Sequence, residues 1–294
     1  MSEAAPRHFR SPDGTSIAAF RSGSPDGPPL LMIHGTSADH TTFRALGPRL
    51  ADAFDLYAID RRGRGASGDT LPYRIEREFE DLASIADTVR TDRGRPVDLF
   101  GHSYGGRCSL GAALRTDAIR RVICYEGAPM PPGRSYHPAG LDEELARLLE
   151  AGDADALLVT FMRDVVGMSD ADLAAYRANP VWPQRVAAAP TIVREMAAEL
   201  DPVASLDALG TIHQPVLQIL GGESISVFRD GVAALDDRLA HGTVVIIPGA
   251  KHAAHHTHLN AVVEATMTFL DLDDPDGPDP AGSHRARSGP PVRD

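Results

Sequence analysis

Short, largely apolar runs alternate along this sequence with longer segments of helical periodicity. Because the runs show little polar alternation, they predict strands that are covered on both faces. They lie at residues 30–33, 54–59, 97–100, 121–125, 215–220 and 243–247. The segments in which apolar side chains recur every three or four positions lie at residues 41–51, 76–92, 107–115, 228–239 and 259–270.

The order of these segments predicts an α/β fold, in which helices cover both faces of a mostly parallel sheet. Residues 8–22 add two strand-like pieces around a Pro-Asp-Gly turn, which is typical of a hairpin. In sheets of this class, ligands bind at the carboxyl ends of the strands. His34, Asp60, Ser103 and Glu126 each stand at the end of a different apolar run. We therefore expect a site where these strand ends meet.

The pattern changes at residues 129–214, where no strand is evident and prolines interrupt successive helical segments. These segments lie at residues 141–151, 154–166, 170–178 and 184–200. An all-helical insertion between two strands predicts a cap over the edge of the sheet. The predicted organisation is a core of residues 1–128 and 215–272, the cap of residues 129–214, and a tail of residues 273–294, which has too few apolar residues to become ordered.

Composition narrows the class of protein and its partners. The chain has 294 residues, 43% of them hydrophobic, and a formal net charge of −12. This charge argues against nucleic acid or an anionic membrane surface as a partner, and for a soluble protein. Neither an apolar N-terminal core nor a run of 18 apolar residues is present, so we expect no signal peptide and no membrane span. Cys108 and Cys124 lie in predicted buried elements, which favours reduced thiols in the cytoplasm. Nothing in the sequence indicates the oligomeric state.

One short motif joins a predicted strand to a predicted helix. It reads Gly101-His102-Ser103-Tyr104-Gly105, and a Gly-x-Ser-x-Gly turn between a strand and a helix is typical of a nucleophile elbow. So tight a turn strains the serine backbone and brings strand and helix together, so both glycine positions must lack a Cβ. Ser103 would then lie at the tip as the nucleophile, and the Tyr104 N–H would point toward an oxygen on the attacked carbon.

Two other patterns argue against a cofactor or a metal ion. The glycine-rich loop at residues 60–68 has neither the lysine of a phosphate-binding loop nor a GxGxxG that opens a helix. His252 and His256 are four residues apart, like two zinc ligands on a helix. However, the chain has no HExxH motif, and no cysteine or carboxylate stands at ligand spacing nearby. We therefore expect His255, His256 and His258 at a helix start or in a pocket, with no metal and no cofactor.

In their order and spacing these motifs resemble the α/β-hydrolase superfamily over residues 8–270. The matching pieces are His34-Gly35, residues 60–67, the elbow at residues 101–105 and residues 249–252. The resemblance implies a helical cap in the inserted segment and a cofactor-free enzyme that acts on an ester-like electrophile. Because a serine stands at position 103, where some relatives carry aspartate, the motif argues against dehalogenase or epoxide hydrolase chemistry.

The resemblance also implies partners for Ser103. His252 follows the last strand, where the family places the histidine that activates the serine. The family's acid most often follows the strand predicted at residues 215–220, in a G-x-x-D context, but this chain reads Gly-Gly-Glu-Ser there. Some members carry the acid on the strand after the nucleophile, where this chain has Glu126. We favour Glu126 as the acid, with Glu223 as the alternative.

The remaining site residues follow from the same likeness. The N–H groups of Thr36 and Tyr104 would form the oxyanion hole, and Asp60 is better explained as a structural residue that holds its glycine-rich loop. Several further residues are candidates for the pocket lining or for the core: Arg61, Tyr125, Phe161, Met162, Trp182 and Met196.

The favoured interpretation is a serine hydrolase that cleaves a carboxylic ester, thioester or lactone of a small molecule through an acyl-enzyme. Two alternatives stay open at this point. The same fold and pocket would also suit a non-hydrolytic or carbon–carbon bond reaction in a natural-product pathway, such as that of a cyclase, a decarboxylase or a C–C hydrolase. The missing aspartate also suits a non-catalytic module that binds a small molecule, because fold alone does not determine function.

Overall fold

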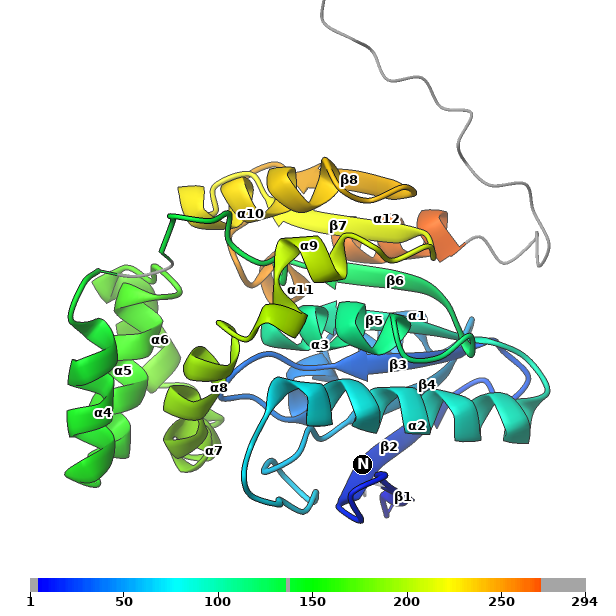
Figure 1. The fold of residues 1–294 in the computed structure, drawn as a ribbon, viewed down its shortest axis with the longest axis horizontal. Helices are drawn as coiled ribbons and strands as arrows, with labels where there is room; N and C mark the ends of the chain where they lie inside the picture. The colour runs from blue at the N-terminus through cyan, green and yellow to red at the C-terminus, as the bar shows by residue number, and fades with distance from the viewer. Residues whose placement is uncertain (1–4, 136–137, 271–294) are drawn as a thin grey trace, which may run out of the picture.

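The computed structural model describes residues 5–135 and 138–270, within which eight strands form one sheet (Figure 1). The strands are β1 (Arg7–Arg10), β2 (Ser16–Gly23), β3 (Pro29–Ile33), β4 (Asp55–Ile59), β5 (Val97–His102), β6 (Ile119–Tyr125), β7 (Val216–Gly221) and β8 (Gly242–Ile247). Their order in the sheet is β1-β2-β4-β3-β5-β6-β7-β8. Strand β2 pairs antiparallel with β1 and β4, and all other neighbours are parallel. The predicted mostly parallel α/β sheet is confirmed.

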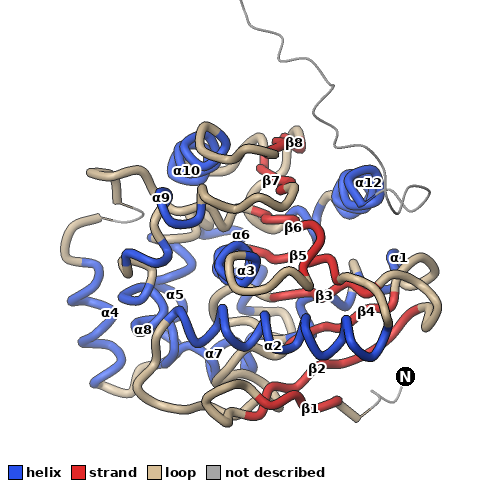
Figure 2. The backbone as a smooth tube through the Cα atoms, turned by 45° about the vertical axis from the view of Figure 1, so that its right-hand side comes forward, coloured by secondary structure: helices blue, strands red, loops and turns tan. Residues whose placement is uncertain are grey.

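Helices cover both faces of this sheet (Figure 2). Those on one face are α2 (Ile75–Arg93), α3 (Tyr104–Ala113) and α10 (Ser226–Asp236), and those on the other are α1 (Gly47–Leu50) and α12 (Leu259–Leu270). Because side chains alternate along a strand, Leu31 packs in the first apolar layer and Met32 in the second. Both layers bury their side chains, so the middle strands are covered on both sides.

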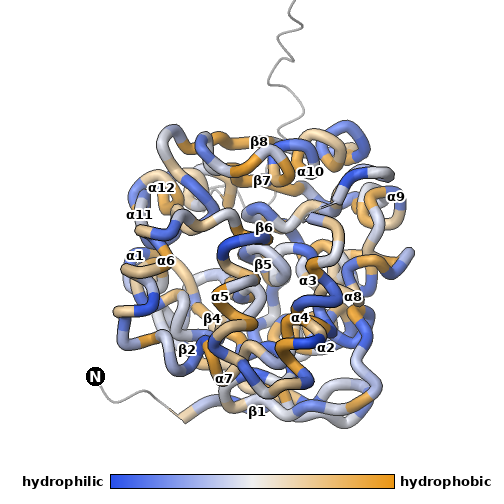
Figure 3. The backbone as a smooth tube through the Cα atoms, turned by 90° about the vertical axis from the view of Figure 1, so that its left-hand side faces the viewer, coloured by the Kyte–Doolittle hydropathy of each residue, from blue (hydrophilic) through white to orange (hydrophobic). Residues whose placement is uncertain are grey.

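Between β6 and β7 the described residues form only helices, turns and loops. The helices are α4 (Leu141–Glu150), α5 (Ala154–Asp164), α6 (Asp170–Arg177), α7 (Trp182–Ala188), α8 (Ile192–Ala198) and α9 (Leu206–Leu209). Helices α4 to α8 bury an apolar cluster of their own, which includes Leu145, Phe161 and Ile192. Leu206 and Leu209 of α9 pack instead in the first apolar layer of the core, although the cap was predicted to extend to residue 214. Figure 1 shows α4 to α8 beside one end of the sheet, and Figure 3, viewed from that side, shows α4, α5 and α7 in front of the strands. This arrangement confirms the predicted helical cap.

Two predicted helices are interrupted at prolines. The segment predicted as one helix over residues 41–51 forms a 3-10 turn (His40–Arg44) and then α1, which has Pro48 in its first turn. The segment predicted at residues 184–200 divides into α7 and α8 around a 3-10 turn that contains Pro190. Proline has no N–H to donate and its ring crowds the preceding turn, so one α-helix cannot run unbroken through either position.

The short helices α9 and α11 (Ala254–Thr257) were not predicted, because four residues are too few to show a period. The predicted tail at residues 273–294 lies outside the described residues. No helix in the described part of the chain is both long and apolar enough to cross a lipid bilayer.

Candidate active site

Ser103 lies in a sharp turn between β5 and α3. Its backbone is in the left-handed region, with φ of 54°, which a non-glycine residue rarely adopts. A Cβ at Gly105 would lie 2.4 Å from the carbonyl oxygens of Ile33 and His34, and a Cβ at Gly101 would lie 2.5 Å from the Gly105 carbonyl oxygen. Only glycine fits at both positions, so the turn has the tight geometry that the motif predicts.

Glu126 directly follows β6, and its carboxylate is fully buried and held by three groups. One oxygen, Oε2, lies 2.6 Å from Nδ1 of His252. The other, Oε1, accepts hydrogen bonds from the Gly221 N–H at 2.7 Å and from the Ser224 hydroxyl at 2.5 Å. The structure therefore brings together the favoured acid and the predicted base, which are 126 positions apart in the chain.

Glu223 lies differently. Its side chain is exposed and makes no hydrogen bond among the described residues, while its N–H donates to the Ala250 carbonyl. The next residue, Ser224, occupies the position of the family's usual aspartate and donates its hydroxyl to Glu126. Sequence reasoning missed Ser224, although the missing aspartate at that position was the signal that could have found it.

His252 is held in place by contacts to its ring and to its backbone. Its ring stacks on Phe228, with centroids 4.5 Å apart and planes 15° apart. Nε2 of His102 lies 2.8 Å from the His252 carbonyl oxygen, and the Tyr125 hydroxyl donates to the neighbouring Lys251 carbonyl at 2.5 Å. Burial and the nearby His252 lower the pKa of His102 well below its usual value, so His102 is neutral and its Nε2 carries the donated proton.

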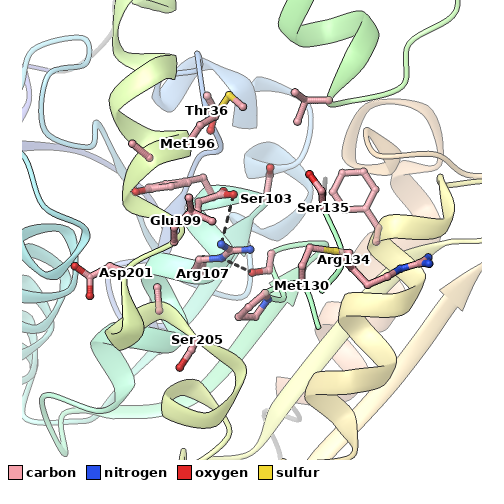
Figure 4. A pocket seen from close by; sticks show the side chains of 18 of the residues that line it. Thr36, Ser103, Arg107, Met130, Arg134, Ser135, Met196, Glu199, Asp201 and Ser205 are labelled. Atoms are coloured by element: carbon pink, nitrogen blue, oxygen red, sulfur yellow. Dashed lines mark hydrogen bonds and ion pairs between the residues drawn. The ribbon is translucent and has the colours of Figure 1, made fainter. Parts of the chain in front are cut away.

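A cavity of about 660 Å³ opens in front of Ser103, between the sheet and the cap (Figure 4). Both Ser103 and His252 line it. Among the described residues no hydrogen bond joins these two side chains, and catalytic hydrogen bonds in ligand-free enzymes are often completed only when substrate binds. Arg107, one turn along α3, and Glu199 of the cap form an ion pair in the cavity wall at 3.4 Å, so the wall combines apolar surface with paired charges.

Four of the six candidates for the pocket lining lie elsewhere. Phe161 and Met196 line the cavity. Tyr125 packs beneath the His252 loop, while Met162 and Trp182 belong to the apolar cluster of the cap. Arg61, the fourth, is fully buried among charged side chains.

Thr36 and Tyr104 both line the cavity beside Ser103. Neither N–H donates to a backbone carbonyl within the described residues, so both stay available to a ligand. Tyr104 is the first residue of α3, and the N-terminus of a helix attracts negative charge. Asp60 has the structural role that was expected. Its carboxylate accepts hydrogen bonds from the backbone N–H groups of His40 and Ala66, which connects the segment after β3 to the glycine-rich loop after β4.

Within residues 5–135 and 138–270, no group of three or more His, Cys, Asp or Glu side chains is arranged to hold a metal ion. His255 is buried beside His102 and His256, with ring centroids 4.4 Å and 4.1 Å apart. His258 contacts the Thr257 hydroxyl at the end of α11. These histidines therefore surround the His252 loop without joining the cavity lining.

Known proteins share this fold and sequence pattern. A family model described as the alpha/beta hydrolase family matches residues 30–265. A 2-(acetamidomethylene)succinate hydrolase of Mesorhizobium japonicum is 28% identical over 265 residues, which cover 83% of this chain and 88% of that protein. A pimeloyl-(acyl-carrier protein) methyl ester esterase of Neisseria meningitidis is 26% identical over 86% of this chain and 80% of that protein. The crystal structure of an alpha/beta hydrolase from Sphaerobacter thermophilus, 32% identical, superposes with a TM-score of 0.75 over 88% of this chain and 100% of that one. The chain therefore belongs to the alpha/beta hydrolase family.

Proposed function

We propose that the protein is a serine hydrolase that cleaves a small carboxylic ester, thioester or lactone through an acyl-enzyme. The observation that carries the proposal is the 2.6 Å contact between Glu126 Oε2 and His252 Nδ1, at a cavity that Ser103 also lines. A carboxylate on Nδ1 holds the neutral imidazole with its proton on that atom. Nε2 of His252 is then left as the free base.

In this mechanism Ser103 Oγ attacks the acyl carbon while Nε2 of His252 takes the hydroxyl proton. The carbonyl oxygen becomes an oxyanion that accepts the N–H groups of Thr36 and Tyr104, and each such donor typically lowers the barrier by about 3 kcal/mol. The imidazolium then protonates the leaving alcohol. In the second half of the reaction the same imidazole takes a proton from water as the water attacks the acyl carbon. The imidazolium then returns this proton to Ser103 Oγ as the bond between Oγ and the acyl group breaks, which releases the carboxylic acid and regenerates the free serine.

Ester chemistry is supported by the methyl ester esterase among the relatives. The deep, partly apolar cavity of about 660 Å³ is of the size that small-molecule sites have. A small-molecule substrate is therefore part of the proposal. So is a cytoplasmic location, which the two free, buried cysteines Cys108 and Cys124 support.

The test is the Ser103→Ala variant, assayed with p-nitrophenyl acetate, with a p-nitroanilide to sample amide cleavage, and with a fluorophosphonate label. We expect the variant to lose both labelling and ester cleavage while it keeps the melting temperature of the parent. If the variant keeps both activities, Ser103 is not the nucleophile. If the parent binds small molecules but turns over none of a broad ester panel, the non-catalytic alternative is favoured. If the variant still converts a non-ester substrate of the parent, the non-hydrolytic alternative is favoured.

A further inference from the structure

Four buried charged side chains lie behind the proposed oxyanion hole. We call Arg61, Arg64, Glu78 and Glu195 the Arg61 cluster. Arg61 pairs with Glu78 at 2.8 Å and with Glu195 at 2.7 Å, and Arg64 pairs with Glu195 at 2.7 Å. The four side chains are at most 2% exposed, and none of them lines the cavity. The cluster joins the loop after β4, helix α2 and helix α8 of the cap.

Arg61 also binds the peptide group that carries the Thr36 N–H. Its Nη2 atom donates to the Gly35 carbonyl oxygen at 3.2 Å. This carbonyl and the Thr36 N–H belong to one trans peptide group, in which the two point in opposite directions. A donor that holds the carbonyl on the buried side therefore determines where the N–H points on the cavity side.

A second donor reinforces this orientation. Nδ1 of His34 lies 2.8 Å from the same Gly35 carbonyl oxygen, while Nε2 of His34 accepts the backbone N–H of Arg61 at 3.1 Å. Because Nε2 accepts, the proton is on Nδ1, which donates to the carbonyl. Burial and the nearby arginines hold the pKa of His34 well below its usual value, so this neutral tautomer persists. Two donors, one of them charged, polarise the peptide group and make its N–H a stronger donor.

Arg61 reaches the other proposed oxyanion donor through its ring. The guanidinium carbon lies over the Tyr104 ring, 4.8 Å from the centroid, which is a cation–π distance. The Tyr104 hydroxyl bonds to that of Tyr73 at 2.9 Å, and Tyr73 donates to Glu78 at 3.0 Å. Arg61 thus contacts the Gly35 carbonyl, which orients the Thr36 N–H, and the ring of Tyr104, whose N–H is the second proposed donor. Arg61 itself does not line the cavity.

The pairing within the cluster is incomplete, which argues against a purely stabilising role. Nε of Arg61 and Nε of Arg64 are buried without a hydrogen bond among the described residues. Buried ion pairs with unsatisfied atoms contribute little net stability, and apolar side chains of similar size often do better. We propose that Arg61 is a positioning residue for the oxyanion hole and that Glu195 of the cap holds Arg61 in place, which couples seating of the cap to the direction of the Thr36 N–H. This inference rests on the proposed hydrolase function.

The test compares Arg61→Met with Arg62→Met. For Arg61→Met we expect kcat on p-nitrophenyl acetate to fall about 10- to 100-fold with little change in KM, because the oxyanion exists only in the transition state. Binding of a trifluoromethyl ketone, which forms a tetrahedral adduct, should weaken by the same factor. Arg62 is equally buried, but it bonds to Asp81 at 2.8 Å and to Asp13 at 3.0 Å. We expect Arg62→Met to lower the melting temperature and to keep kcat.

The outcomes separate this inference from the hydrolase proposal. If Ser103→Ala is inactive while Arg61→Met keeps kcat, the positioning role is wrong and the hydrolase stands. Equal losses of kcat in Arg61→Met and Arg62→Met would also overturn it, because the effect would then be a general loss of structure. If Arg61→Met does not fold, Glu195→Gln replaces it: a fall in kcat at constant KM supports the coupling to the cap, and an unchanged kcat refutes it.

Discussion

Replacing Glu126 by glutamine should prevent His252 from acting as the base, because it reverses the hydrogen bond between residue 126 and Nδ1 of His252. Oε1 of Glu126 accepts two donors, the Gly221 N–H and the Ser224 hydroxyl. In Glu126→Gln the amide oxygen must occupy this position, because an NH₂ group there would face two donors. The NH₂ group then takes the place of Oε2 and donates to Nδ1 of His252, which lies 2.6 Å from that oxygen. The imidazole is left with its proton on Nε2, where it cannot accept the Ser103 proton.

The size of the effect follows from this tautomer. A triad whose acid is changed to its amide loses about 10⁴ in kcat, and each tenfold loss corresponds to about 1.4 kcal/mol of barrier. Because the Glu126 side chain is fully buried, water has no access to restore the acceptor. We therefore expect kcat to fall about 10³- to 10⁴-fold, or about 4 to 5.5 kcal/mol, with little change in KM.

The assay is hydrolysis of p-nitrophenyl acetate by Glu126→Gln and by Glu223→Gln as the matched control, with melting temperatures to verify folding. The Glu223 side chain is exposed, so the kcat of Glu223→Gln should stay within about twofold of the parental value. The reasoning is refuted if folded Glu126→Gln keeps more than about a tenth of the parental kcat. Comparable losses in the two variants would refute it as well.

Two further predictions concern stability. In Gly105→Ala the new Cβ would lie 2.4 Å from backbone oxygens of Ile33 and His34, so we expect the free energy of unfolding to fall by more than about 3 kcal/mol in urea titrations. Gly47→Ala, with no atom within 4 Å of the new Cβ, is the control, and equal stability of the two variants would contradict the close approach at the elbow. Burial lowers the pKa of His255 well below its usual value, so as pH falls below about 6.5 the unfolded chain takes up a proton that the folded one refuses, and stability declines. His255→Leu should make this loss smaller but not abolish it, because the pKa values of the buried His34 and His102 are lowered too. Since both ring nitrogens of His255 lack partners within the described residues, the variant should also be more stable by about 1 to 2 kcal/mol at pH 7.5; a variant that shows the parent's full loss of stability between pH 7.5 and 5.5 would contradict it.

Local sequence was enough to predict most of the framework. Apolar runs of four to six residues located the central parallel strands, and the long periodic segments located α2 and α12. The elbow around Ser103 could be predicted because its cause is local, since strand and helix approach within a few bonds of the serine. The predicted helix bounds were wrong where proline interrupted a periodic pattern, at Pro48 and Pro190. The spacing of apolar residues does not show that proline lacks the N–H group that an α-helix needs.

The sequence by itself determined the strand–turn–helix at Ser103, the order of the core and the helical insertion, because each follows from spacing over a few residues. Only the tertiary structure decided that His252 pairs with Glu126 and not with Glu223, since both glutamates follow apolar strands. It also decided that the loop after β7 supplies donors to that carboxylate, and that Arg61 meets Glu195, 134 positions further along the chain. The partners of buried polar groups depend on which strand ends and helices the folded core brings together. A local sequence pattern cannot predict these long-range contacts.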